Sequence, residues 1–346
     1  MSLQKFPGFT DIHVHLREPG ATHKEDFSTG SRAAIKGGFT FIIDMPNNPL
    51  FTLTKARLSQ KIKLSKKKAI CDIGFYFGTN GENIPEFKHV WNNKQVFGLK
   101  LFLNHTTGEM LIEDIGKLEQ IFKSWQSQKP ILVHAEGVQL AAALALAHFY
   151  NRKLHVCHLS QDTEVELIKK AKAKKQAVTA GVTPHHLFMT EKDVLKMKGF
   201  AMVKPKLGTQ KDQDSLWQGL QNGTIDLVET DHAPHTIEEK KADPPAHGIT
   251  GLEAALGLLF LAVKNKKLKQ KDVIRLLYDK PKEIFNIPNQ PHTFIELDPQ
   301  KPYIFGQDTF ETKCNWYPYK DWQLYGKVEK VVLYGKTVLQ NGKIIV

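Results

Sequence analysis

The sequence has little of what an exported or membrane-bound protein needs. Its 346 residues contain three cysteines, an odd and sparse set that fits a reducing compartment better than a disulfide framework. The longest apolar runs, Leu140–Phe149 and Ala254–Val263, are about half as long as the roughly 20 residues of a membrane span. Residues 1–10 lack the basic start and apolar stretch of a secretory signal. We therefore expect a cytoplasmic protein with no membrane partner.

Arginine is also scarce. The chain has five arginines, although its lysines and arginines total 48 and its formal net charge is +12. The lysines cluster at residues 61–68, 169–175 and 264–271, each time beside apolar residues at helical spacing. A nucleic-acid-binding surface more often mixes arginine with aromatic residues, because arginine reads bases and stacks on them. We interpret the lysine clusters as solvated helix faces and expect no nucleic-acid partner.

The remaining composition is that of a globular protein, with 41% hydrophobic and 24% charged residues. It excludes a collagen, a disordered tail protein and a disulfide-stapled miniprotein. A length prior of about 150 residues per domain suggests two domains, but a (β/α) barrel often exceeds 250 residues as one unit.

Eight apolar runs of strand length end in polar residues, and amphipathic stretches such as Phe27–Lys36 and Thr163–Lys175 lie between them. Strands that alternate with helices predict a parallel sheet, and eight is the number that closes a (β/α) barrel. A count from one sequence can be off by one, so seven or nine strands stay open. The predicted strands are Phe9–His15, Phe39–Pro46, Cys71–Gly78, Val96–Leu103, Pro130–Glu136, Lys153–Ser160, Gln176–Thr183 and Thr224–Thr230.

The pattern changes near the C-terminal end, where short strands separated by glycine turns replace the alternation. We therefore expect an α/β fold in which residues 9–288 form a catalytic (β/α)8 barrel. Residues 1–8 and 289–346 would form a small accessory β subdomain, an appendage to the barrel. Its expected strands and turns are Thr293–Leu297, Val328–Leu333, Thr337–Leu339, Tyr334–Lys336 and Asn341–Gly342.

Residues that bind metals lie at the ends of these predicted strands. His13 and His15 follow the first apolar run, and side chains at i and i+2 of a strand point the same way, so both imidazoles can reach one ion. The C-terminal strand ends of a barrel converge on one face, where active sites are built. The sequence thus predicts one cluster there. Four further strands each contribute one residue to this cluster, namely Lys100, His134, His158 and Asp231.

Histidine and carboxylate without clustered cysteine favour zinc, with iron, manganese or cobalt as alternatives. Four histidines and one aspartate exceed the roughly three protein ligands of a single catalytic zinc, so two metals fit better. Lys100 is the odd member, because an ammonium group cannot bind a cation. Burial favours the neutral amine of a lysine, and a neutral amine can add carbon dioxide to become a bridging carbamate.

Seven segments carry this chemistry in a recognisable order: Pro7–Gly20, Thr22–Asp26, Asp44–Asn47, Gly98–Leu101, His134–Glu136, Thr183–Leu187 and Thr230–His235. Together they resemble the cyclic amidohydrolases, and among these most of all the dihydroorotases of the lysine-bridged type. The resemblance covers essentially the whole chain. It implies a TIM barrel of the metal-dependent hydrolase type.

The resemblance also implies the cofactor and the reaction. It places two zinc ions in each subunit, one bound by His13, His15 and Asp231 and the other by His134 and His158. Carboxylated Lys100 and a hydroxide would bridge the ions. The reaction is the reversible cyclisation of N-carbamoyl-L-aspartate to L-dihydroorotate and water, in pyrimidine biosynthesis, with Asp231 as the catalytic proton shuttle.

Arg17 is the first candidate for substrate binding, because its guanidinium fork suits the carboxylate of the substrate. Two candidates, Lys204 and His247, differ from the residues usual in the family. At Gly181 an acid is missing, so we expect no third metal. The other substrate-binding candidates implied by the resemblance are Asn47, Thr106, His235 and Gly248.

Three alternatives stay open. A hydantoinase or dihydropyrimidinase is disfavoured by Arg17, because its substrate ring lacks the carboxylate, whereas Lys204 leaves an allantoinase open. A catalytically silent subunit supporting aspartate carbamoyltransferase is disfavoured by the complete ligand set. A nucleic-acid-binding role would rest on the net charge alone. The resemblance also suggests a homodimer and an aspartate carbamoyltransferase partner.

Overall fold

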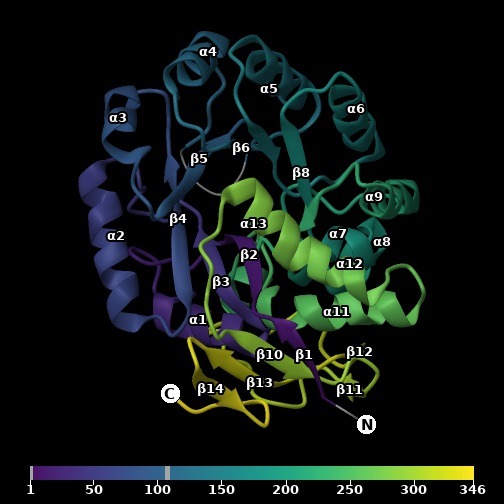
Figure 1. The fold of residues 1–346 in the computed structure, drawn as a ribbon. Coiled ribbons are helices and arrows are strands. Elements are labelled where there is room, and N and C mark those ends of the chain that lie inside the picture. Colours follow the sequence, from purple (N-terminus) through teal and green to yellow (C-terminus); the bar gives the residue numbers. More distant parts are fainter. Residues whose placement is uncertain (1–2, 106–109) are drawn as a thin grey trace.

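The computed structural model describes residues 3–105 and 110–346 and confirms the predicted barrel. In these residues eight parallel strands are hydrogen-bonded in chain order, β2 to β9, within a ring of helices (Figure 1). Each predicted strand contains one of them. Their bounds are β2 (Phe9–Val14), β3 (Phe39–Asp44), β4 (Asp72–Gly78), β5 (Val96–Phe102), β6 (Ile131–His134), β7 (Leu154–Val156), β8 (Val178–Val182) and β9 (Leu227–Val228).

The last and first strands meet just beyond β9. Val14 pairs in parallel with His232, and the His15 backbone N–H donates to the His232 carbonyl at 2.8 Å. The Thr230 backbone N–H also donates a hydrogen bond to Asp11 Oδ1 at 3.1 Å. These contacts bring the two ends of the sheet together, as a barrel requires.

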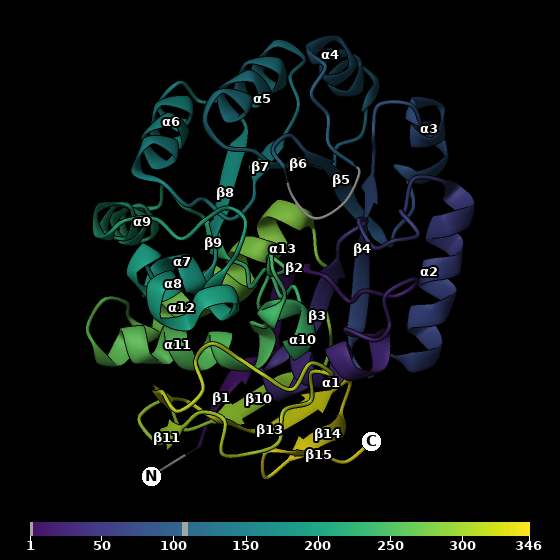
Figure 2. The ribbon, with the colours of Figure 1, turned by 180° about the vertical axis from the view of Figure 1, so that it is seen from behind.

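Helices surround the outside of the sheet, and α13 lies across one of its openings (Figures 1 and 2). Local sequence sets their ends: Asp26 caps α1 by accepting from the Ser28 and Thr29 N–H groups, and Asp114 caps α4. No helix within the described ranges is long and apolar enough to cross a membrane. The helices are α1 (Phe27–Lys36), α2 (Lys55–Lys68), α3 (Phe87–Val90), α4 (Ile115–Ser124), α5 (Gly137–Phe149), α6 (Asp162–Ala173), α7 (Pro184–Phe188), α8 (Glu191–Met197), α9 (Gln210–Asn222), α10 (Ile237–Lys241), α11 (Leu252–Lys264), α12 (Gln270–Ile274) and α13 (Lys280–Phe285), with short 3-10 or π turns at Ile84–Glu86, Lys198–Ala201 and Arg275–Asp279.

The inside of the barrel is packed rather than open. Ile12, Tyr76 and Leu132 belong to one buried apolar cluster with Phe285 of α13. The Phe285 ring lies 6.1 Å from that of Tyr76 and 5.2 Å from that of His155. Helix α13 therefore closes one opening of the barrel. The polar residues at the carboxyl ends of the strands lie at the other opening.

A second sheet, antiparallel, lies beside the barrel at the bottom of Figure 1. Tyr334 and Gly335 form one of its predicted turns with positive φ angles of 50° and 79°. Whether this sheet is a separate domain stays a prediction. Its strands, in spatial order, are β1 (Gln4–Pro7), β10 (Phe294–Leu297), β13 (Val328–Leu333), β14 (Lys336–Gln340) and β15 (Lys343–Ile344), and the strands β11 (Pro302–Ile304) and β12 (Gln323–Tyr325), which we did not predict, pair nearby.

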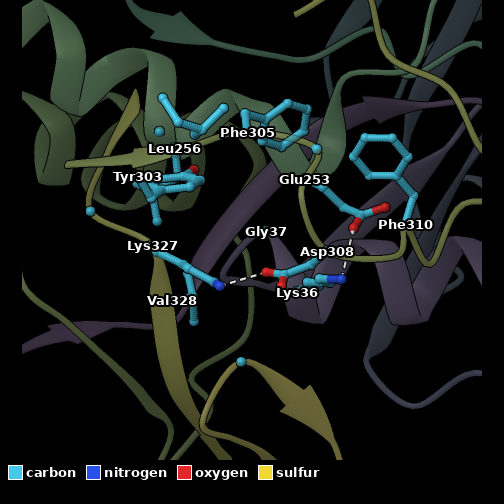
Figure 3. A pocket seen from close by; sticks show the side chains of 15 residues that line it. Lys36, Gly37, Glu253, Leu256, Tyr303, Phe305, Asp308, Phe310, Lys327 and Val328 are labelled. Carbon is cyan, nitrogen blue, oxygen red and sulfur yellow. Dashed lines mark hydrogen bonds and ion pairs between the residues drawn. The ribbon is translucent and has the colours of Figure 1, made fainter. Parts of the chain in front are cut away.

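A pocket marks the joint between the barrel and this sheet, as Figure 3 shows. Lys36 at the end of α1 pairs with Glu253 of α11 at 3.7 Å, and Lys327 pairs with Asp308 at 2.5 Å. Burial raises the pKa of Glu253 to about 7. Glu253 Oε1 also accepts from the Thr312 N–H at 3.2 Å, so the carboxyl group links the barrel to the segment that precedes β12.

The interpretation of the lysine clusters as solvated helix faces is wrong for Lys61 of α2, which is 1% exposed. Its ammonium group lies 2.8 Å from Asp44 Oδ2, and it donates to the Met45 carbonyl at 2.6 Å and to Asn48 Oδ1 at 3.0 Å. The packing of α2 against β3 buries this one member of the cluster. The hydrogen bonds of Lys61 to Met45 and Asn48 hold the loop that carries Asn47.

We expect Lys61→Met to lower the free energy of unfolding by about 3 kcal/mol, because it leaves the Asp44 carboxylate buried without its partner. Lys63→Met, on the exposed side of the same helix, should change it by less than about 0.5 kcal/mol. Urea denaturation of the two variants measures the difference. Equal midpoints would contradict a structural role for the Lys61–Asp44 pair.

Candidate metal centre

Three predicted ligands come together at the junction of β2 and β9. His15 Nε2 lies 3.0 Å from Asp231 Oδ1, and His13 Nε2 lies 3.4 Å from the same oxygen. His13 lies near the end of β2, and His15 directly follows that strand. Asp231 lies in the segment after β9 and has a left-handed backbone (φ 47°). We call His13, His15 and Asp231 the first ligand group.

The hydrogen bonding and the pKa of His15 make this group suitable for binding a cation. Its Nδ1 lies 2.8 Å from Asn47 Oδ1, an acceptor, and so carries the ring proton. Burial lowers the pKa of His15 to about 4, so the ring is neutral at pH 7 and its Nε2 has a lone pair. His15 Nε2 and Asp231 Oδ1 thus lie 3.0 Å apart, an imidazole nitrogen and a carboxylate oxygen of the kinds that bind zinc.

His134 at the end of β6 and His158 after β7 form the second ligand group. His134 Nδ1 lies 3.1 Å from His158 Nε2, and nitrogens bound to one tetrahedral zinc lie about 3.3 Å apart. Their other ring nitrogens are buried without a hydrogen-bond partner in the part of the chain described here. The His158 ring is 5.1 Å from that of His13, so the two groups adjoin.

Electrostatics keeps the second group in the form that binds metals. Burial, with the charge of Lys100, lowers the pKa of His134 to about 3, and burial also lowers the pKa of His158. Burial alone would raise the pKa of Asp231, but His13 and His15 outweigh it and lower that pKa well below its usual range. At neutral pH the second group thus offers two neutral imidazoles, and Asp231 an ionised carboxylate.

Lys100 of β5 has no exposed surface, and its Nζ donates to Cys157 Sγ at 3.1 Å. Among the described residues this weak thiol is the hydrogen-bond acceptor of Lys100, which leaves a buried ammonium group poorly satisfied. The side chain belongs to the same strand-end cluster, because β5 adjoins β6, which carries His134. Lys100 thus lies beside the second ligand group, although the distances do not involve it in either group.

Arg17 and His235 lie beside the first ligand group. Arg17 Nε donates to the Pro234 carbonyl at 3.1 Å, and its Nη2 lies 3.2 Å from His235 Nε2. Trp316 Nε1 donates to the His235 carbonyl at 2.7 Å, which fixes the loop. Arg17 also has a left-handed backbone (φ 61°), a conformation that is uncommon for non-glycine residues and frequent at functional sites.

The remaining substrate candidates lie on neighbouring loops. The Gly248 N–H donates to the Met202 carbonyl at 2.9 Å, which joins the segments of Lys204 and Gly248. Burial, with the charge of Lys204, lowers the pKa of the half-buried His247. Gly248 has a φ of 133°, and a Cβ there would lie 2.6 Å from the Ala233 carbonyl oxygen. Thr106 lies outside the described residues.

Asn47 has a contact that we did not predict, since its amide oxygen is bound to His15. Its nitrogen is the donor that the prediction requires for a substrate carboxylate. Glu229 was missed altogether, although its fully buried Oε2 lies 3.3 Å from His13 Nδ1. A signal was present in the sequence: Glu229 is a charged residue that directly follows the apolar pair of β9.

The barrel and its cluster of buried ligands define a metal-dependent hydrolase. The family model described as the amidohydrolase family matches residues 5–290. The chain therefore belongs to the amidohydrolase family.

Two curated relatives illustrate its place in that family. The chain is 39% identical to the multifunctional protein CAD of Squalus acanthias over 347 residues, which are 99% of this chain but 15% of that protein. It is 33% identical to the dihydroorotase of Pyrococcus abyssi over 349 residues, or 98% of this chain and 84% of that one. The chain thus spans a small part of the multifunctional relatives and most of the shorter one.

Solved structures agree on the fold. The L-hydantoinase (dihydropyrimidinase) from Arthrobacter aurescens superposes with a TM-score of 0.94 at 23% identity, covering 99% of this chain and 87% of that one. The inactive dihydroorotase-like domain of the Chaetomium thermophilum CAD-like protein gives 0.84 at 25% identity, covering 100% and 97%. At this level the hydantoinase likeness concerns the fold alone.

We expect His134→Ala to reduce the zinc-binding capacity of the metal-stripped protein, because it removes one of the two facing nitrogens of the second ligand group. Equilibrium dialysis against zinc measures the capacity. His148→Ala, an exposed histidine of α5, is the matched control and should bind as much zinc as the unmodified protein. The same capacity in His134→Ala as in the control would contradict the second ligand group.

Proposed function

We propose that this protein is a dihydroorotase that interconverts N-carbamoyl-L-aspartate and L-dihydroorotate in pyrimidine biosynthesis. One observation carries the choice of substrate: a buried arginine, Arg17, lies directly beyond the metal-ligand pair of β2. A guanidinium group fixed at that place suits a ring that bears a carboxylate. The 33% identity to a protein named dihydroorotase, over 84% of its length, supports the same choice.

The proposed cofactor is a pair of zinc ions in each subunit. His13, His15 and Asp231 would hold one ion, and His134 and His158 the other. When bound, the ions supply Lewis acidity toward the reacting carbonyl and a water that is acidic enough to act at neutral pH. Lys100 would bridge them as its carbamate, a modification supported by its burial and by its poor hydrogen bonding as an amine.

Asp231 is the proposed catalytic residue. Its carboxylate is ionised at neutral pH, because His13 and His15 lower the pKa well below its usual range, so neither oxygen carries a proton. In ring opening it would take the proton of the attacking water and deliver it to the ring nitrogen that leaves. Ring closure reverses these transfers, so one carboxylate serves both directions.

The proposed substrate site surrounds the first ligand group. Arg17 and the amide nitrogen of Asn47 would bind the carboxylate, with His235 as a further donor. Lys204 and His247 would stand near the ring, and the backbone of Gly248 would meet its amide. Thr106, outside the described residues, is proposed for the loop that closes over the substrate.

The proposed setting is the cytoplasm, with a homodimer and an aspartate carbamoyltransferase as partners. Similarity to the multifunctional proteins of Squalus acanthias and Dictyostelium discoideum supports such an association, although the chain covers 15% of each. A carbamoyltransferase releases the substrate of this reaction, so the two activities are chemically consecutive.

The proposal predicts that zinc-loaded protein consumes L-dihydroorotate, measured as the loss of ring-amide absorbance. Dihydrouracil, hydantoin and allantoin are run in parallel, because they lack the carboxylate of dihydroorotate. We expect turnover of dihydroorotate alone, and Lys100→Ala should lose at least about 100-fold because no carbamate can form.

The other outcomes of this assay name the alternatives. Turnover of another ring alone would make the protein a hydantoinase, a dihydropyrimidinase or an allantoinase. No turnover of any ring by protein that contains zinc would favour a silent subunit, like the inactive domain from Chaetomium thermophilum. Full activity of Lys100→Ala would contradict the bridging role.

Arg17→Met should lower kcat/KM for dihydroorotate by roughly 100-fold, about 2.7 kcal/mol, because the substrate carboxylate loses its charged partner. Most of the loss should appear in KM, since the carboxylate is bound equally before and during the reaction. Arg57→Met, an exposed arginine of α2, is the control. Steady-state kinetics of both variants tests the assignment, and an unchanged KM in Arg17→Met would contradict it.

A further inference from the structure

One buried carboxylate contacts both ligand groups without belonging to either. Glu229 has no exposed surface. Its Oε2 lies 3.3 Å from His13 Nδ1, and its Oε1 accepts the backbone N–H of His158 at 2.5 Å. The same side chain therefore contacts one residue of the first group and one of the second.

The contact with Oε2 determines where His13 carries its proton. An ionised carboxylate can only accept hydrogen bonds, so His13 Nδ1 must be the donor. In a neutral imidazole the lone pair then lies on Nε2, the atom 3.4 Å from Asp231 Oδ1. This is the nitrogen that a metal in the first group would need, and outer carboxylates orient metal-binding histidines in this way.

The contact with Oε1 acts on the second group through the backbone. His158 has a left-handed conformation with φ 38°, which costs free energy in any residue except glycine. Its N–H is buried at this point and needs an acceptor, which Glu229 supplies. The bond holds the residue at the angle that aims its Nε2 at His134 Nδ1.

Gly181 of β8 leaves the space that this carboxylate fills. A Cβ at position 181 would lie 2.6 Å from Glu229 Oε1 and 2.8 Å from its Cδ, closer than unbonded atoms approach. The glycine on β8 and the glutamate after β9 are thus one feature of the packing. A short acidic side chain at 181 would reach the same space if Glu229 were truncated.

We propose that Glu229 is a positioning residue that orients His13 and His158 together, so that a single carboxylate sets the geometry of both ligand groups. The inference rests on the proposed metal site. It requires that loss of the carboxylate weakens zinc binding at both groups.

The test is Glu229→Gln in the full chain. Glutamine keeps the volume, but its amide has one acceptor oxygen, whereas Glu229 meets two N–H donors. Competition with a chromophoric chelator, starting from metal-stripped protein, measures zinc affinity. We expect both zinc equivalents to bind about 10–100-fold more weakly. A purely structural role would lower the melting temperature of the metal-free protein and leave zinc affinity unchanged.

Glu164→Gln is the matched control. Glu164 is also buried, and its Oε2 accepts the Ser160 and Gln161 backbone N–H groups at 2.9 and 3.2 Å, so it caps α6 rather than orienting a ligand. The zinc affinity of the Glu164→Gln variant should equal that of the unmodified protein. A rescue variant combines Glu229→Ala with Gly181→Asp, and should bind zinc more tightly than Glu229→Ala alone.

The outcomes separate this inference from the proposed function. Unchanged zinc affinity in Glu229→Gln overturns the positioning role and leaves the metal site intact. Failure of the unmodified protein to bind zinc overturns the site and this inference with it. If Glu229→Gln does not fold, the rescue pair decides: tighter binding with Asp at 181 supports the role, and equal binding overturns it.

Discussion

Closure of the parallel sheet is the constraint on which the candidate site depends. The pairing of Val14 with His232 joins the end of β2 to the segment after β9. It brings together His15 and Asp231, which are 216 residues apart in the chain. Without that closure the first ligand group would not exist, and the neighbouring strands would present single histidines. The packed interior and α13 at the other opening support this geometry from within.

Much of this arrangement could be predicted because it follows from topology. The i and i+2 spacing of His13 and His15, and the rule that parallel strand ends converge, require no knowledge of distances. What was missed depends on contacts between distant segments. Glu229 acquires its place from Gly181 and His13 on other strands, and Lys61 differs from its neighbouring lysines only by packing against β3. Residues 1–8 were assigned to the accessory β subdomain, but β1, with one buried side chain among four residues, has too little pattern for its bounds to be predicted.

The comparisons show how far the fold alone determines function. A hydantoinase and an inactive dihydroorotase-like domain both superpose on nearly the whole chain, so the barrel is compatible with another substrate and with no catalysis. The differences in activity among proteins with this barrel must lie in the residues at the strand ends. Here the buried Arg17 and the lowered pKa values of His15, His134 and His158 support the proposed metal centre. The positions of Lys204 and His247 are where substrate preference would be adjusted.

In the proposed site the two ligand groups bind two adjacent metal ions bridged by Lys100. A crystal structure of the zinc-loaded protein, with anomalous diffraction recorded at the zinc edge, would locate both ions. We expect two anomalous peaks, one among His13, His15 and Asp231 and one between His134 and His158, with density that extends Lys100 toward both. A single peak, or two peaks with an unmodified Lys100, would contradict it.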